Sequence, residues 1–401
     1  MNSQSPRYRG VLFAAGLATA AFAVAACTAP GAGTLEQGNT IKIGAILPVT
    51  GPVSEWGESN SAVLEMFEEE VNADGGVNGK DLEIVIYDSG ADPAEAANLV
   101  RKLASDDEVI AIMGPFTSSE AEVAFPVANQ LEVPITAQAS SKPGVAEANR
   151  PWAFRNTIDE SVYLQAVVPA MAEDIGAQEV AIAYDSADAV GSAIGEAILP
   201  AVLGETNLTV VNSDKPVTFT TDDIDLKSQV GSLASQDPDA IGVGAFYNGA
   251  GKLLREMSNR GARIPIFGGS TLVSSNILDA APQTPIFTAG TYYPDAEASA
   301  EWTDRVTAAF AEHGVPGSPT MFDSQLYEIG QMYVEAIETG ELGDKDVGTA
   351  REGIRDFMTD LEGFQGLTTE ISMKETGDAT REFFVIKGVD KAWSVLGTSK
   401  P

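Results

Sequence analysis

Small hydroxyl-bearing residues gather at two places in the sequence where chemistry could occur. Residues 114–119 read Gly-Pro-Phe-Thr-Ser-Ser, and residues 138–141 read Gln-Ala-Ser-Ser. Serine hydroxyls, together with the free backbone N–H groups at the start of a helix, can hold an anion such as a carboxylate. Ser119 and Glu122 also fit a capping box for a helix predicted over 121–130. The pattern therefore indicates an anion site, a helix cap, or both.

Both hydroxyl-rich stretches are predicted to follow neighbouring strands. Apolar runs at 109–113 and 133–139 predict strands that end where the polar residues begin. In an open α/β sheet, ligands bind at the carboxyl ends of the strands. We therefore expect Ser118, Gln138 and Ser140 to lie close together.

The stretch 41–103 sets the architecture that positions these residues. Apolar runs at 41–47 and 82–87 predict strands, and the apolar stripe between them predicts a helix. Asp92 and Pro93 are typical of a second helix start, with aspartate as N-cap and proline at the first helical position. This β-loop-α order builds a parallel sheet, and it begins again after residue 157, which predicts a second α/β domain.

The composition limits the possible functions. A chain of 401 residues with 44% hydrophobic residues suits two domains, and a net charge of −34 argues against nucleic acid or an anionic membrane face as partner. His313 is the only histidine and Cys27 the only cysteine. Zinc sites, thiol catalysis and Ser-His-Asp triads are therefore not expected. The acidic run 220–225 lacks the glycine and final glutamate of a calcium loop. We expect no metal, no cofactor and no enzymatic activity.

The N-terminal segment is predicted to be a signal peptide over residues 1–26. Arginines precede an alanine-rich apolar run that is too short for a stable membrane span. The run ends Val24-Ala-Ala-Cys27, which resembles a bacterial lipobox, so Cys27 would carry a diacylglyceryl anchor. A plain secretory signal with an incidental cysteine is the alternative. Residues 27–40 would form a flexible tether.

Three linked motifs carry a family resemblance. They are P-x-T-G-P-x-x-x-W-G from Pro48, N-A-D-G-G-V-N-G from Asn72, and Y-D followed by D-P-A-E-A from Tyr87. Together they resemble type I periplasmic-binding-protein-like solute receptors, in the branch around the leucine/isoleucine/valine-binding protein of ATP-binding-cassette importers. The resemblance extends from about Ile41 to the C-terminus.

The resemblance implies an α/β fold with two doubly wound parallel-sheet lobes joined by three crossing segments. The implied lobe boundaries are 40–158 with 292–378, and 159–291 with 379–401. It also implies a monomeric, extracytoplasmic solute-binding subunit that delivers a small molecule to a membrane permease and ATPase. The alternative is a receptor of the same fold that reports ligand to a signalling partner.

The resemblance further implies which residues bind the ligand. Trp56 and Phe246, or Tyr247 in place of the latter, would supply aromatic walls. Hydroxyls and backbone groups would hold the ligand carboxylate. The full implied set is Trp56, Thr117, Ser118, Gln138, Ala139, Ser140, Phe246, Ser270, Phe322 and Asp323.

Two departures from the family pattern bear on the ligand. Ser270 stands where the branched-chain receptor has an ammonium-binding glutamate, and the segment 186–191 lacks the tyrosine seen in amino-acid receptors. Asp323 could replace the missing acid if it faces the cleft, which favours an amine or amide. If Asp323 instead caps a helix predicted over 325–339, the ligand would be uncharged or anionic. We favour the amino-acid-like or amide-like ligand.

Overall fold

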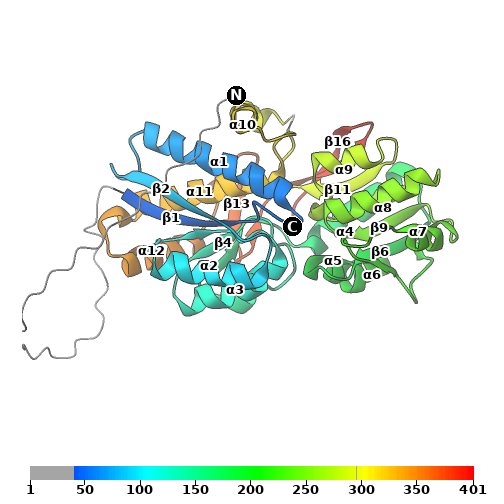
Figure 1. Ribbon diagram of the computed structural model, residues 1–401, viewed down its shortest axis with the longest axis horizontal. Helices are drawn as coiled ribbons and strands as arrows, with labels where there is room; N and C mark the ends of the chain where they lie inside the picture. Colours follow the sequence, from blue (N-terminus) through cyan, green and yellow to red (C-terminus); the bar gives the residue numbers. More distant parts are fainter. Residues whose placement is uncertain (1–39, 295) are drawn as a thin grey trace, which may run out of the picture.

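The computed structural model describes residues 40–294 and 296–401, arranged as two α/β lobes that lie side by side (Figure 1). The first lobe contains the N-terminal strands and helices together with α10, α11 and α12, and the second lobe contains α4 to α9. The predicted signal peptide, Cys27 and all of the tether except Thr40 fall outside the described residues.

The first lobe is built on a five-stranded parallel sheet in the order β2-β1-β3-β4-β5. Its strands are β1 (Thr40–Leu47), β2 (Asp81–Asp88), β3 (Ile112–Met113), β4 (Ile135–Ala137) and β5 (Ala153–Arg155). Most side chains of β1 are buried, as expected for a parallel strand covered on both faces. The predicted parallel arrangement is confirmed.

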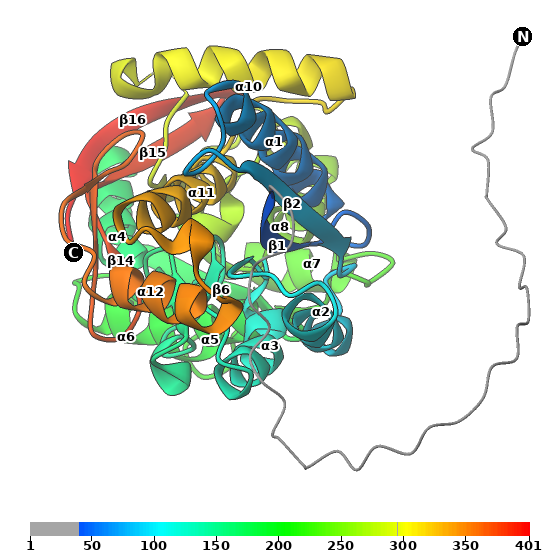
Figure 2. The same cartoon turned by 90° about the vertical axis from the view of Figure 1, so that its left-hand side faces the viewer.

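Helices cover both faces of this sheet. Figure 2 shows α2 and α3 on one side and α1 and α11 on the other. Asp92 caps α2 as predicted, because its carboxylate accepts hydrogen bonds from Ala94 N and Glu95 N at 2.7 and 3.0 Å. The helices are α1 (Ser54–Ala73), α2 (Pro93–Ser105), α3 (Ser118–Gln130), α10 (Ala300–His313), α11 (Met321–Thr339) and α12 (Val347–Thr359).

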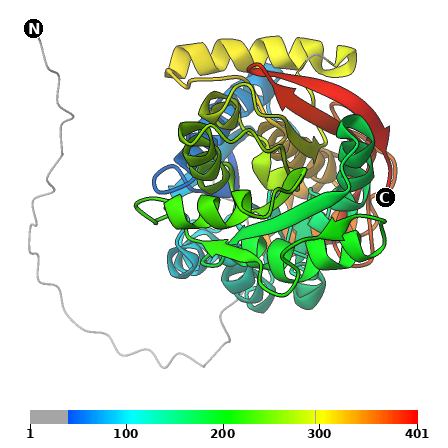
Figure 3. The ribbon, with the colours of Figure 1, turned by 90° about the vertical axis from the view of Figure 1, so that its right-hand side faces the viewer.

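The second lobe has a mixed sheet in the order β16-β15-β11-β10-β9-β6-β7, with β8 paired to β6 (Figure 3). Its parallel part consists of β6 (Glu179–Asp185), β7 (Thr209–Val210), β8 (Val217–Phe219), β9 (Ala240–Gly244), β10 (Ile266–Phe267) and β11 (Ile286–Gly290). The helices are α4 (Glu160–Ile175), α5 (Ala189–Ala193), α6 (Leu199–Gly204), α7 (Lys227–Ala234), α8 (Tyr247–Asn259) and α9 (Ser275–Ala280).

An antiparallel hairpin completes this second sheet. β15 (Phe383–Val389) pairs antiparallel with β11, and β16 (Ala392–Ser399) pairs antiparallel with β15. The sequence predicts a strand near β15 but none at β16. Most side chains of β16 are exposed, so it lacks the alternation of buried and exposed residues from which a strand is recognised.

The chain passes between the lobes after β5, after β11 and before β15, and a buried carboxylate ties two of these passages together. Glu328 of α11 accepts hydrogen bonds from Asn156 Nδ2 at 3.1 Å, from Leu367 N at 2.9 Å and from Arg381 Nη2 at 2.9 Å. Glu328 and Arg381 form an ion pair whose two side chains are completely buried. A small antiparallel sheet, β12 (Phe364–Gln365), β13 (Glu370–Met373) and β14 (Ala379–Thr380), leads into the last passage.

Candidate functional site

Aromatic side chains from both lobes surround Trp56 where the lobes meet. Trp56 lies in the first turn of α1 and is completely buried. Its ring stacks on Phe116 of the first lobe at 5.1 Å between centroids and meets Phe322 edge-on at 4.9 Å. From the second lobe, Phe246 and Tyr247 approach to 5.6 and 4.6 Å. The predicted aromatic walls Trp56, Phe246 and Phe322 are therefore in one cluster.

The capping box at the start of α3 differs from the predicted one. Thr117 is the N-cap: its Oγ1 accepts from Glu120 N, and the Glu120 carboxylate accepts from Thr117 N at 2.9 Å. The expected pair of Ser119 and Glu122 is therefore wrong by two residues, because the helix begins at Ser118. The Thr117 side chain is therefore used in capping the helix, whereas the Ser118 hydroxyl is not part of the capping box.

Ser118 and Ser140 come together as expected from their places after neighbouring strands. Ser140 Oγ donates to Ser118 Oγ at 3.4 Å, and Lys142 N donates to the same oxygen at 3.2 Å. Both serines are buried, as is Ala139 between the two predicted binding residues Gln138 and Ser140. The hydroxyls lie at the N-terminus of α3, where backbone N–H groups and the helix dipole favour an anion.

Asp323 adopts the capping alternative. Its Oδ2 accepts from Thr320 N at 2.7 Å and Thr320 Oγ1 at 2.9 Å, in a capping box that starts α11 at Met321. Its Oδ1 accepts from Ser59 Oγ at 2.6 Å and Asn60 Nδ2 at 2.8 Å. Burial raises the pKa of the Asp323 carboxyl, against the opposing effect of these hydrogen bonds. With both oxygens already bonded within its own lobe, Asp323 does not supply the missing amine-binding acid, and the capping outcome taken alone favours an uncharged or anionic ligand.

Gln138 is joined to the Asp323 network through Asn60. Its Nε2 donates to Asn60 Oδ1 at 2.9 Å, while its Oε1 is buried without a hydrogen-bond partner. Among the described residues, Trp56 Nε1, Thr271 Oγ1 and both side-chain polar atoms of Gln325 are also buried without a hydrogen-bond partner. Native proteins leave few such groups unsatisfied, so these atoms are suited to a polar ligand.

No sequence pattern indicates Glu160 as a site residue, although the structure places it beside Ser270. The hydroxyl of Ser270 donates to Glu160 Oε1 at 2.6 Å and its N–H donates to Oε2 at 3.0 Å. Glu160 is the first residue of α4. An acidic residue at a helix start is ordinary in a sequence, and its partner Ser270 lies 110 residues further along the chain, so no local signal distinguishes it.

Polar contacts also join the lobes at a second place, on the side chain of Glu55. This carboxylate accepts from Ser274 Oγ at 2.9 Å and from Asn276 Nδ2 at 2.7 Å, both in the second lobe. Asn248 Nδ2 donates to Pro52 O at 2.7 Å. Burial raises the pKa of the Glu55 carboxyl. No sequence motif identifies these residues, because their pairing depends on how the two lobes meet.

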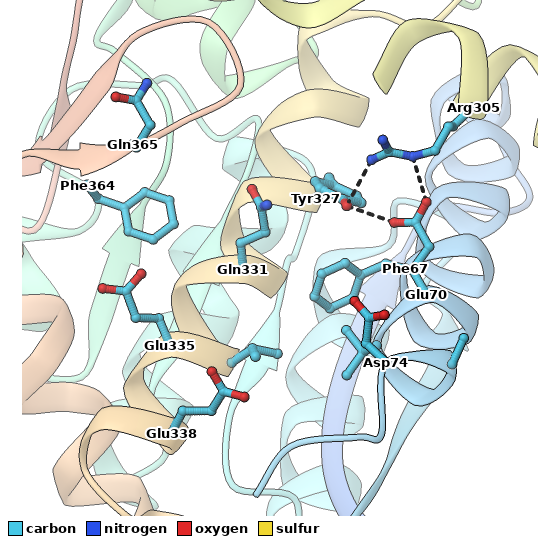
Figure 4. A pocket seen from close by; sticks show the side chains of 13 residues that line it. Phe67, Glu70, Asp74, Arg305, Tyr327, Gln331, Glu335, Glu338, Phe364 and Gln365 are labelled. Carbon is cyan, nitrogen blue, oxygen red and sulfur yellow. Dashed lines mark hydrogen bonds and ion pairs between the residues drawn. The ribbon is translucent and has the colours of Figure 1, made fainter. Parts of the chain in front are cut away.

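A separate groove of about 730 Å³ lies on the first lobe between α1 and α11. Figure 4 shows Tyr327 and Arg305 joined to Glu70 at one side, with Phe67 below them. Glu70 accepts from Tyr327 Oη and from Arg305 Nε, each at 2.8 Å. None of the predicted binding residues lines this groove.

Within residues 40–294 and 296–401, the acidic side chains, with the one histidine, form no cluster of three or more that could hold a metal ion. Across the same residues no helix combines the length and the apolar character needed to cross a membrane.

Comparison with known proteins identifies the family. A sequence model of the periplasmic binding proteins matches residues 40–392. The chain belongs to this family. It is a type I periplasmic binding protein of the Leu/Ile/Val-binding branch, and so an extracytoplasmic solute receptor rather than an enzyme.

Similar proteins include the Leu/Ile/Val-binding protein of Rhizobium johnstonii, which is 24% identical over 86% of this chain and 90% of its own length. A branched-chain amino acid transporter substrate-binding protein from Streptococcus pneumoniae, solved with isoleucine, superposes with a TM-score of 0.79 at 22% identity, covering 90% of this chain and all of the other. A solute-binding protein from R. palustris, solved with benzoate, superposes with a TM-score of 0.77 at 20% identity, covering 90% and 97% of the two chains. The solved structures establish the fold, and their ligands differ.

Proposed function

We propose that this periplasmic binding protein is the solute-binding subunit of an ATP-binding-cassette importer and takes an amino-acid-like or amide-like ligand between its lobes. The observation that carries the proposal is the cluster around Trp56, since its walls come from both lobes and close only when the lobes meet. Bound solute would thereby be enclosed, and hinge closure would report an occupied site to a permease and ATPase. The relatives named for leucine, isoleucine and valine support an amino-acid-like ligand.

The proposal is tested by identifying the solute. Native mass spectrometry of the purified protein should detect a co-purifying small molecule, and titration calorimetry should give a single site for it. Deletion of a permease encoded beside the gene should abolish uptake of that solute. If the protein binds the solute but deletion of the permease leaves uptake of that solute unchanged, a signalling receptor would be favoured instead.

Alanine at Ser118 or Ser140 should weaken solute binding by about 1–3 kcal/mol, the range for leaving a buried hydrogen-bonding group without its partner. The two hydroxyls contact each other at the start of α3, where a ligand carboxylate would sit. Calorimetry with the identified solute measures the change. The control is Ser119→Ala, one residue further along α3 and only half-buried, which should leave the affinity unchanged. Wild-type affinity in both Ser118→Ala and Ser140→Ala would refute the anion site.

We also propose that Cys27 carries the membrane anchor. Cys27→Ser should move the protein from the membrane fraction to the soluble fraction, because the thioether to diacylglyceryl can no longer form. Fractionation and intact-mass measurement check this outcome. A wild-type protein without acyl mass, or a serine variant that stays in the membrane fraction, would contradict the assignment.

A further inference from the structure

The groove between α1 and α11 of the first lobe is lined in part by apolar side chains (Figure 4). Phe67 is buried, and Val71, Val334 and Phe364 are half-buried. A Cβ atom at Gly330 would lie 2.7 Å from the Phe67 ring, so glycine at this position lets the ring lie against α11. With a volume of about 730 Å³, this α1–α11 groove has the size and the apolar lining of a small-molecule site.

The charged side chains of the α1–α11 groove are mostly negative. Its acidic residues are Glu70, Asp74, Glu335 and Glu338. Its one basic residue, Arg305, already has partners, because its Nε donates to Glu70 Oε1 at 2.8 Å and its Nη2 donates to Tyr327 Oη at 3.3 Å. Among the residues that the structure describes, no basic side chain pairs with Asp74, Glu335 or Glu338. A ligand that carries a positive charge would meet unpaired carboxylates here.

The helix backbones add negative potential at one end of the α1–α11 groove. The two helices run in the same direction, since Asn60 Nδ2 donates to Asp323 Oδ1 at 2.8 Å near their starts and Asn78 Nδ2 donates to Ile337 O at 3.2 Å near their ends. The last turn of neither helix contains a basic residue. The negative ends of two helix dipoles therefore lie together without a compensating cation.

Gln331 of α11 offers a hydrogen-bond acceptor inside the groove. Figure 4 shows its side chain between Phe364 and Tyr327. Its Oε1 is buried without a partner, and none of the described residues bonds to its amide. Rotation about the last side-chain torsion, which has a broad energy minimum, would turn this oxygen toward the groove without breaking a hydrogen bond. A donor that enters the groove could therefore be bonded by Gln331.

We propose that the α1–α11 groove binds an organic ammonium ion with an apolar body. The carboxylates, the helix ends and Gln331 favour a cationic donor, while the rings of Phe67 and Phe364 favour an apolar body. The chain's own tether is not such an occupant, because residues 27–39 contain no lysine or arginine. None of the residues around Trp56 lines the groove except through the helices they share, so this site goes beyond the proposed solute-binding function and does not depend on it.

The test compares probes that share one apolar chain and differ in charge. Titration calorimetry of the full chain would use hexylammonium, hexanol and hexanoate. We expect hexylammonium to bind roughly tenfold tighter than hexanol at low salt, because several exposed carboxylates each contribute a small favourable term. This preference should shrink as the salt concentration is raised. Hexanoate should bind most weakly of the three.

Variants of the lining residues should change this preference in opposite directions. Glu335→Gln combined with Glu338→Gln should weaken hexylammonium binding by roughly tenfold and leave hexanol binding unchanged. Gln331→Leu should reduce the preference by roughly threefold, since the acceptor is lost. Arg305→Met frees the Glu70 carboxylate and should strengthen hexylammonium binding by roughly threefold, a gain that general damage to the fold would not produce.

The control is Glu352→Gln, which removes an exposed acid of α12 that does not line the groove. It lowers the net negative charge by the same amount as either glutamine substitution in α11. Hexylammonium should bind to this variant as it does to the wild type.

Three outcomes would overturn the inference. Equal binding of hexylammonium and hexanol by the wild type would show that the acidic residues do not select a cation. An equal loss per charge in Glu352→Gln and in the α11 variants would reduce the effect to attraction by the whole acidic chain. A loss in Ser118→Ala but in none of the groove variants would place the amine between the lobes. Each of these results leaves the solute-binding proposal intact, because that proposal is tested with the co-purifying solute.

Discussion

Replacing Arg381 with methionine is expected to lower the free energy of unfolding by about 3–5 kcal/mol, the loss typical of breaking a buried ion pair on one side. The change removes the cation from Glu328, whose carboxylate is inaccessible to solvent. Glu328 would keep its hydrogen bonds from Asn156 and Leu367, but no positive charge would remain beside it. Urea denaturation followed by circular dichroism measures the loss.

Two controls test whether the expected loss of stability is due to the unpaired buried charge of Glu328. Arg305→Met removes a partly exposed partner of Glu70 and should cost no more than about 1 kcal/mol, as exposed ion pairs do. The double variant Arg381→Met with Glu328→Met should recover much of the lost stability, because no charge is left unpaired. If Arg381→Met has the same free energy of unfolding as Arg305→Met, the prediction is contradicted.

Truncating Trp56 to alanine should cost about 3–5 kcal/mol of stability, which is the usual penalty for removing a buried tryptophan side chain. Unlike an ordinary core residue, Trp56 contacts aromatic rings of both lobes. We therefore expect an additional effect on shape: the variant should have a larger radius of gyration by small-angle X-ray scattering. It should also bind the solute more weakly, because the aromatic wall is lost.

Trp302→Ala is the matched control for this experiment. Trp302 is also buried, but its aromatic neighbours are Tyr292 and Tyr327, away from the cluster around Trp56. It should lose comparable stability with no change in the radius of gyration. If both tryptophan variants change the scattering equally, Trp56 has no special part in holding the lobes together.

Local sequence patterns predicted the parts of this protein that local interactions determine. The strands β1 and β2 follow from apolar runs, and the start of α2 follows from Asp92 and Pro93. The serines at 118 and 140 meet because parallel strands end at one edge of a sheet. The true capping boxes, Thr117 with Glu120 and Thr320 with Asp323, also match a local pattern of Ser or Thr three residues before an acid. They could have been predicted.

The rest of the site depends on contacts between residues far apart in the chain. Glu160 and Ser270 are 110 residues apart, and Glu55 and Ser274 are 219 apart. Neither pair can be inferred until the two sheets are placed against each other. The strand β16 was missed for a different reason, since its side chains are mostly exposed and give no period-two pattern.

The interleaved course of the chain has a consequence for how the protein acquires its structure. Tyr333 of α11 anchors that helix to the first sheet through hydrogen bonds with Ile112 O and Thr136 Oγ1, yet α11 follows every parallel strand of the second sheet. The second sheet in turn leaves the edge of β11 unpaired until β15 arrives. During synthesis, the first lobe therefore waits for α11 and α12, and the second sheet waits for β15 and β16, which emerge last. An open strand edge is a site for aggregation, so the growing polypeptide needs protection from association until its final hairpin has emerged.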